Sequence, residues 1–137
     1  MEKGDRMKQT LYEDISLVFL GGSLYYLIEI LWRGFSHVSM FFCGGCCFLS
    51  VGKAATFLKG KVSLFMKMLV GTAIITSLEF LTGVIVNIWM KLNVWDYSDM
   101  PGNLFGQICL QYSIFWFFLT IPCMKLYDWV RENVFSV

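Results

Sequence analysis

The stretch that decides the fold runs from Phe65 to Met90 and reads FMKMLVGTAIITSLEFLTGVIVNIWM. Its only charged residues are Lys67, close to its start, and Glu79. A helix rises about 1.5 Å per residue, so a helix of this length spans the roughly 30 Å hydrocarbon core of a bilayer. We therefore predict a transmembrane helix over residues 65–90, and we interpret the rest of the chain around it.

Three further apolar runs lie at about residues 11–32, 37–58 and 107–127. Each is close to the ~20 residues that a membrane-spanning helix requires. Short turns at 33–36 and 59–61 join the first three runs, and a polar loop at 91–106 precedes the fourth. The predicted fold class is all-α: a single polytopic membrane domain over residues 1–137 with four transmembrane helices, multi-pass in the cell membrane.

The composition excludes several classes of protein. Hydrophobic residues make up 57% of the chain and charged residues 15%, whereas soluble domains carry about 25% charged residues. Lipid must therefore cover much of the surface, and the lipid bilayer is the first expected partner. A net charge of +1 argues against a nucleic-acid partner, because nucleic-acid binding needs a basic face.

The Lys and Arg residues predict the orientation. In a four-span chain only Arg33 and Lys91 fall on the side of the 91–106 loop, and the others fall on the side of the termini: Lys3, Arg6, Lys8, Lys53, Lys59, Lys61, Lys67, Lys125 and Arg131. The positive-inside rule then places both termini in the cytoplasm and the loop outside it. A three-span chain would split these basic residues between the two sides. We expect residues 1–10 to form a polar tail and residues 128–137 an amphipathic end on the membrane surface.

Two carboxylates lie inside the predicted helices, where an ionisable side chain costs at least about 2.5–3.5 kcal/mol at mid-depth. Glu29 precedes Arg33 by four residues, the spacing and order that favour an ion pair on one helix face. This pair has either a purely structural role or a functional one. Glu79 has no basic residue within a helical turn. Desolvation favours the uncharged form of such a carboxyl group, which lets Glu79 donate a hydrogen bond or carry a proton.

Glu79 also belongs to a polar stripe on one face of its helix. The stripe contains Thr72, Thr76, Glu79, Gly83 and Asn87 and covers roughly 22 Å at 1.5 Å per residue. It is long enough to line much of a membrane path or to form a polar seam against another helix. Both interpretations stay open.

The loop contains the segment WDYSDMPGN, from Trp95 to Asn103. In one interpretation Asp96 and Ser98 form local turns, while Trp95 and Tyr97 anchor the loop at the membrane interface. In the other, the loop is functional, because connections of this length in a small bundle tend to be. We expect one convergent site at the outer membrane face, built from Glu29, Arg33, His37, Asn87, Asp96, Asp99, Asn103 and Gln107.

The five cysteines do not indicate a disulfide framework, because their number is odd and most lie in apolar runs. Cys43 and Cys46 have the spacing of a redox or metal motif, but no second ligand pair follows. Cysteine is also a common small apolar residue of packed interiors. We predict no metal and no cofactor.

The same residues resemble a known family. The segments Trp95-Asp96-Tyr97-Ser98, Pro101, Asn103 and Gly106-Gln107-Ile108-Cys109 are similar to the signature of the ABC-transporter type IV membrane family, also called CmpB-like. Glu79-Phe80-Leu81-Thr82-Gly83 looks like its acidic motif, and the Glu29 region with Arg33 to Met40 looks like its first-span and loop motif. The likeness covers about Leu17 to Phe118. It implies a permease.

Three functions are compatible with these patterns. The first is a permease-like or channel-like subunit in which Glu79 relays protons or cations and Asp96 and Asp99 attract a solute. It would need homo-oligomerisation, since four spans are few for a transport path. Any ATPase would be a separate subunit, since the chain has no G-x-x-x-x-G-K-[ST] motif.

The second function is a non-catalytic membrane scaffold or sensor in which the outer polar residues only stabilise the fold. The third is an outer-leaflet membrane enzyme in which His37 is the general base, with Glu29, Asp96 or Asp99 as partners or metal ligands. The sequence favours a protein that is not an enzyme.

Overall fold

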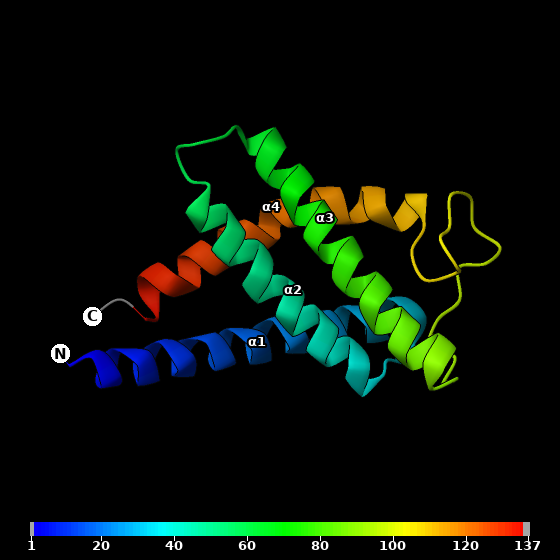
Figure 1. Ribbon diagram of the computed structural model, residues 1–137, viewed down its shortest axis with the longest axis horizontal. Coiled ribbons are helices and arrows are strands. Elements are labelled where there is room, and N and C mark those ends of the chain that lie inside the picture. The colour runs from blue at the N-terminus through cyan, green and yellow to red at the C-terminus, as the bar shows by residue number, and fades with distance from the viewer. Residues whose placement is uncertain (1, 136–137) are drawn as a thin grey trace.

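The computed structural model describes residues 2–135, which form four long helices joined by short turns and one long loop (Figure 1). The helices are α1 (Lys3–Arg33), α2 (Val38–Phe57), α3 (Leu64–Gly83) and α4 (Leu110–Asn133), and a π-helical segment, η1 (Val84–Trp89), continues α3. The predicted all-helical fold is confirmed.

Each helix boundary has a local cause. Gly34 adopts a left-handed conformation (φ 86°) and its N–H donates to the Ile30 carbonyl, which ends α1. The side chains of His37 and Ser63 accept from the backbone N–H of Ser39 and Met66, which caps the starts of α2 and α3.

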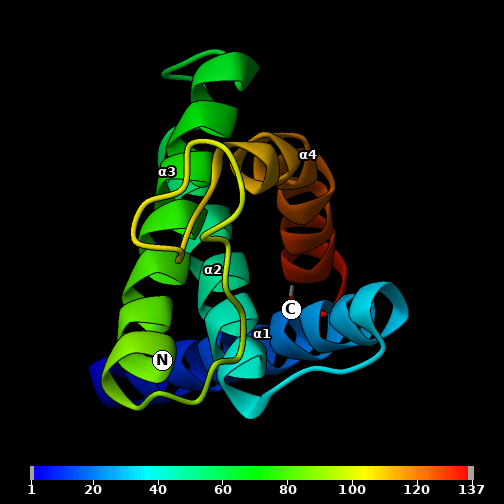
Figure 2. The ribbon, with the colours of Figure 1, turned by 90° about the vertical axis from the view of Figure 1, so that its right-hand side faces the viewer.

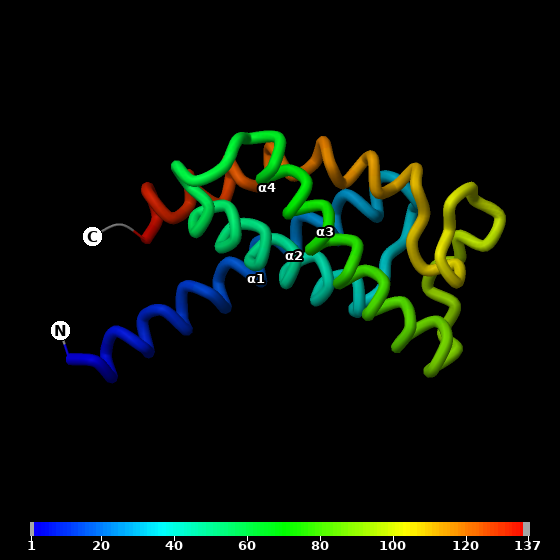
Figure 3. Tube along the Cα trace, turned by 45° about the horizontal axis from the view of Figure 1, so that its top comes forward, coloured from blue at the N-terminus to red at the C-terminus, as the bar shows by residue number. Residues whose placement is uncertain are grey.

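Successive helices run in opposite directions. Both chain ends and the α2–α3 turn lie toward one end of the bundle, whereas the α1–α2 turn and the long loop lie at the other (Figures 1 and 3). Viewed from the loop end, residues 90–109 lie across the ends of α3 and α4 (Figure 2). This alternation agrees with a bundle whose loops lie on two opposite sides.

Three segments are long and apolar enough to cross a membrane: α1, α2 and the continuous stretch Leu64–Trp89. Their large apolar side chains are widely exposed, as Leu31 (78%) and Phe57 (70%) illustrate; lipid covers such a surface more readily than water. α4 is not among them, because Gln111 interrupts its first turn and Lys125 and Asp128 its last turns. These three candidate spans agree with the predicted membrane fold, whereas the fourth span and the orientation of the termini remain predictions.

Two helices extend beyond the predicted spans. Residues 3–10, predicted as a polar tail, form the first turns of α1, and residues 128–133, part of the predicted amphipathic end, continue α4; where the membrane begins and ends along these helices stays a prediction. Extending an existing helix adds a hydrogen bond for each residue fixed, so it continues past the apolar region. Residues 136 and 137 of that end lie outside the described residues.

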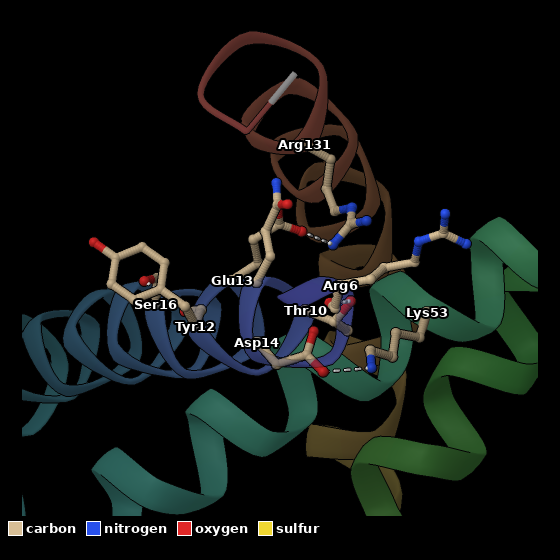
Figure 4. Close-up of polar contacts among 9 residues, drawn as sticks. Arg6, Thr10, Tyr12, Glu13, Asp14, Ser16, Lys53 and Arg131 are labelled. Atoms are coloured by element: carbon tan, nitrogen blue, oxygen red, sulfur yellow. Dashed lines mark hydrogen bonds and ion pairs between the residues drawn. The ribbon is translucent and has the colours of Figure 1, made fainter. Parts of the chain in front are cut away.

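Two ion pairs connect helices near the chain ends, and one of them involves the extension of α4. Arg131 on α4 pairs with Glu13 on α1 at 3.4 Å, and Lys53 on α2 pairs with Asp14 on α1 at 2.7 Å (Figure 4). Both pairs lie toward the end of the bundle that holds the termini. These two ion pairs connect α1 with α2 and with α4 at that end of the bundle.

α2 is the central helix and packs against α1, α3 and α4. Its contact with α1 is close because glycines of each helix lie against larger residues of the other: a Cβ on Gly44 would lie 2.5 Å from Cβ of Tyr25, and one on Gly22 would lie 2.5 Å from the Phe41 carbonyl oxygen. Small residues allow membrane helices to approach in this way.

Candidate functional site

Glu79 is buried at the centre of the bundle. Glu79 is 4% exposed, and its Oε2 accepts a hydrogen bond of 2.7 Å from Nε1 of Trp116 on α4. Its Oε1 has no hydrogen-bond partner among the described residues. A buried carboxyl oxygen without a partner is costly, so this atom is a candidate point of contact for a proton or a ligand.

A cavity of about 180 Å³ adjoins Glu79. One wall comes from α1, with Tyr25 and Ile28, and the opposite wall from α4, with Trp116 and Leu119. Other lining residues come from α2 and α3: Cys43, Gly44, Cys47, Phe48, Ile75 and Glu79. The cavity therefore lies between α1 and α4, and Glu79 is its only acidic lining residue.

A second cavity of about 410 Å³ lies next to the first, toward the loop end. The two share Tyr25, Ile28, Trp116 and Leu119 in their walls. The second also contains Glu29, Arg33, Trp32, Tyr97, Gln111 and Tyr112. We refer to the two together as the α1–α4 groove. It extends from the buried carboxyl group to the polar residues at the loop end of the bundle.

Glu29 and Arg33 form the predicted pair. Arg33 Nε lies 2.6 Å from Glu29 Oε2, and the hydroxyl of Tyr25 donates to Glu29 Oε1 at 3.0 Å. Arg33 Nη1 also donates to the backbone carbonyl of Val94 in the loop at 3.1 Å. The pair thus fixes the end of α1 to the loop, and it also contributes to the wall of the groove.

Asn87 and Gln107 hold the loop against the end of α3. Asn87 Nδ2 donates to Gln107 Oε1 at 2.9 Å, and its Oδ1 accepts from the Val94 N–H at 2.6 Å. The indole N–H of Trp95 donates to the Gln107 carbonyl at 3.0 Å. Trp95 is therefore buried within the protein (5% exposed), and the alternative in which it anchors the loop in the lipid interface is wrong.

The remaining loop residues mostly bond to each other. Asp96 Oδ1 accepts from the hydroxyl and from the backbone N–H of Ser98, and these two bonds lower the pKa of Asp96 below its ordinary value. Asn103 donates to the carbonyls of Ser98 and Met100 and accepts from the N–H of Gly106. The local-turn interpretation of this segment is therefore confirmed.

Tyr97 stacks on Tyr112 of α4, with ring centroids 5.0 Å apart. Burial raises the pKa of its hydroxyl well above the ordinary value. It faces the groove rather than a lipid interface.

Asp99 and His37 neither line the groove nor take part in the loop contacts described above. Asp99 is exposed in the loop and forms no hydrogen bond or ion pair within residues 2–135. His37 caps α2: its Nδ1 accepts from the Ser39 N–H at 3.1 Å and lies 2.8 Å from the Ser39 hydroxyl. The structure therefore divides the expected convergent site into a groove side, with Glu29 and Arg33, and a loop brace, with Asn87, Asn103 and Gln107.

The polar stripe around Glu79 is not uniform. The hydroxyls of Thr72 and Thr76 donate to carbonyls of their own helix, and Gly83 lies against Gln107 and Trp95. Only Glu79 of this stripe lines the groove.

The sequence reasoning missed Tyr25, Trp116 and Tyr112 as site residues. Tyr25 lies four residues before Glu29, so helical spacing could have indicated it. Trp116 and Tyr112 were hidden in an aromatic run, since no local pattern marks which rings of that run point inward. All five cysteines are free thiols. Within residues 2–135, no group of three His, Cys, Asp or Glu side chains is arranged to hold a metal ion.

Comparison with known proteins identifies one family. The model of a family described as "Putative ABC-transporter type IV" matches residues 17–137. No solved structure matches the chain. The match includes the groove, the loop brace and every motif on which the resemblance rests.

Proposed function

This chain belongs to the ABC-transporter type IV family, and we propose that it is a permease-like membrane subunit whose α1–α4 groove carries the solute or proton. The observation that carries the proposal is the free Oε1 of Glu79 beside an otherwise apolar cavity. Ionisable groups at such depth are typical of substrate and proton pathways. Glu79 takes up and releases the proton or cation in this proposal.

The proposed topology has four spans with both termini in the cytoplasm. α4 is the fourth span: its first four turns present Ile114, Phe115 and Phe118, each about half exposed or more, to the surroundings. The positive-inside count supports the orientation. Labelling of single engineered cysteines at residues 5 and 99 with a membrane-impermeant maleimide, in cells and in inverted vesicles, tests it; residue 99 is expected to react only from outside.

The groove is open on one side of a single chain, so we propose that homo-oligomerisation in the cell membrane completes the path. A separate ATPase subunit supplies energy if transport is active. The positions of Glu29 and Arg33 at the outer end of the groove support their role at its entrance, together with Tyr97. The exposed Asp96 and Asp99 add negative charge to the outer loop.

The test is proton flux into proteoliposomes that contain the purified protein and an internal pH-sensitive dye. An imposed pH gradient is expected to drive proton entry through the wild-type protein, and Glu79→Gln is expected to abolish it. Glu2→Gln is the matched control, because Glu2 is exposed and lies at the start of α1. Absence of flux, or equal flux in wild type and Glu79→Gln, would overturn the proposal.

A scaffold or sensor is the second candidate, and the loop brace favours it. Asn87, Asn103 and Gln107 use their amide groups to hold backbone, as structural residues do. This candidate predicts that Glu79→Gln lowers the amount of folded protein in the membrane. Full abundance of that variant together with lost flux would exclude it.

A further inference from the structure

We propose that the α1–α4 groove binds a lipophilic monovalent cation, of the class of an aromatic quaternary ammonium, against the carboxylate of Glu79 in exchange for a proton. This inference rests on the permease-like function proposed above and names its substrate class. It follows from the charge of Glu79, the aromatic lining of the groove, the neighbouring ionisable groups and the exchange of a proton for a cation.

Glu79 is a buried acidic group whose negative charge has no positive side chain beside it. Glu79 Oε2 accepts from the Trp116 indole, whereas Oε1 has no partner. No Lys, Arg or His side chain within residues 2–135 forms an ion pair with Glu79. A buried carboxylate needs an opposite charge close by, so either a proton or a cation from outside the chain must neutralise this group.

Aromatic side chains line the cavity beside the carboxyl group. Tyr25 and Trp116 are both lining residues, and their rings contact each other with centroids 5.8 Å apart. The row continues outward from Trp116 to Tyr112 at 6.4 Å and from Tyr112 to Tyr97 at 5.0 Å. Faces of aromatic rings attract cations, above all quaternary ammonium groups. A hydrated metal ion would lose its water in these walls, so the groove suits a cation that carries its own apolar groups.

Several other ionisable groups surround Glu79. α1 contributes Tyr25 and Glu29, α2 contributes Cys43 and Cys47, α4 contributes Cys123, and the loop contributes Tyr97. Arg33 already neutralises Glu29 through their 2.6 Å contact. The phenol and thiol groups are neutral in their ordinary protonated forms. Glu79 is therefore the group that balances the charge of a bound cation.

The exchange of the Glu79 proton for the cation balances in atoms and charge. The O–H bond of the Glu79 carboxyl group breaks, the proton leaves to water, and the cation takes its place beside the carboxylate. One proton is released for each cation bound. Low pH opposes binding, because it keeps Glu79 protonated.

The experiment is isothermal titration calorimetry on the full chain in lipid nanodiscs with two probes of the same shape. Benzyltrimethylammonium carries a fixed positive charge, and neopentylbenzene is its neutral carbon analogue. At pH values below the pKa of Glu79, we expect the affinity for the cation to rise by about tenfold per pH unit, and at higher pH we expect it to level off. Titrations in buffers of different ionisation enthalpy should show one proton released. Neopentylbenzene should bind independently of pH.

Two variants sharpen the result. Glu79→Gln is expected to weaken binding of the cation by about tenfold or more, since a charge-assisted contact is lost, and to leave neopentylbenzene binding within about twofold. The neutral probe thereby reports that the variant is folded. Glu2→Gln should behave as wild type with both probes.

The outcomes separate the two proposals. Equal affinity for both probes, or cation binding that is unchanged in Glu79→Gln, overturns the cation site even if Glu79-dependent proton flux is found. Binding of the cation with proton release supports the site. If that binding occurs without any flux in proteoliposomes, the permease-like function fails and the binding site stands.

Discussion

Replacing Asn87 with alanine removes the side chain that joins α3–η1 to the outer loop. Two buried groups lose a short hydrogen bond, the Val94 N–H at 2.6 Å and the Gln107 side-chain oxygen at 2.9 Å, and the Trp95 N–H loses a longer one of 3.4 Å. Val94 and Gln107 are 8% and 4% exposed, so water reaches them poorly. An unsatisfied buried group costs about 1–3 kcal/mol, and two of them predict a loss of about 2–6 kcal/mol in the free energy of unfolding.

The assay is unfolding by sodium dodecyl sulfate in mixed micelles, with hydrogen exchange of the 91–106 amides measured in parallel. Faster exchange at Val94 and Trp95 is expected in Asn87→Ala. Asn133→Ala is the control, because Asn133 is exposed and bonds only to the Trp129 carbonyl of its own helix; it should change stability by less than about 0.5 kcal/mol. A loss below about 0.5 kcal/mol in Asn87→Ala, with unchanged exchange, would refute the structural role of the brace.

Three further predictions concern the loop and the pair that fixes it. Gly106→Ala should destabilise the loop by about 1–3 kcal/mol, because Gly106 has φ 73° and an added Cβ would lie 2.8 Å from the Ser98 hydroxyl oxygen; limited proteolysis within 91–106 should accelerate, and unchanged cleavage would contradict this. Arg33→Met should cost about 1–3 kcal/mol in the same detergent assay, since it leaves Glu29 partly buried without its cation; the double variant with Glu29→Gln should cost less than the sum of the single variants, whereas additivity would argue against coupling. The lowered pKa of Asp96 predicts a contribution to loop stability that is present at neutral pH and is lost as the pH falls through the folded-state pKa of Asp96; the protection of the Ser98 amide, measured relative to its intrinsic exchange rate at each pH, should then fall in wild type but not in Asp96→Asn.

Several elements of the fold were predictable because they depend on local spacing. The apolar runs predicted four membrane helices, of which three are long and apolar enough to span a membrane, and the i, i+4 spacing predicted the Glu29–Arg33 pair that the structure contains. The local turn at Asp96 and Ser98 followed from the preference of these residues for bonding to nearby backbone. The extents of α1 and α4 were not predictable from hydropathy, because a helix continues through polar residues.

The candidate site was predicted only in part, for a different physical reason. Asn87, Asn103 and Gln107 are all polar residues near the loop end of the bundle, but polarity alone does not distinguish a ligand-binding amide from one that holds backbone. The geometry made that distinction. It assigned these residues to the loop brace and left Glu29, Arg33 and Tyr97 on the groove.

The sequence by itself determined that the chain is a helical membrane protein of this family, because composition and apolar length depend on residues that are close together in the chain. Only the tertiary structure decided that Glu79 meets Trp116, 37 positions later, and that α1 and α4 form the two walls of a groove. In a water-soluble helix, polarity marks the outer face. In lipid the outer face and the packed face are both apolar, so the rotation of each helix, and with it the partner of a buried carboxyl group, depends on packing between segments distant in sequence.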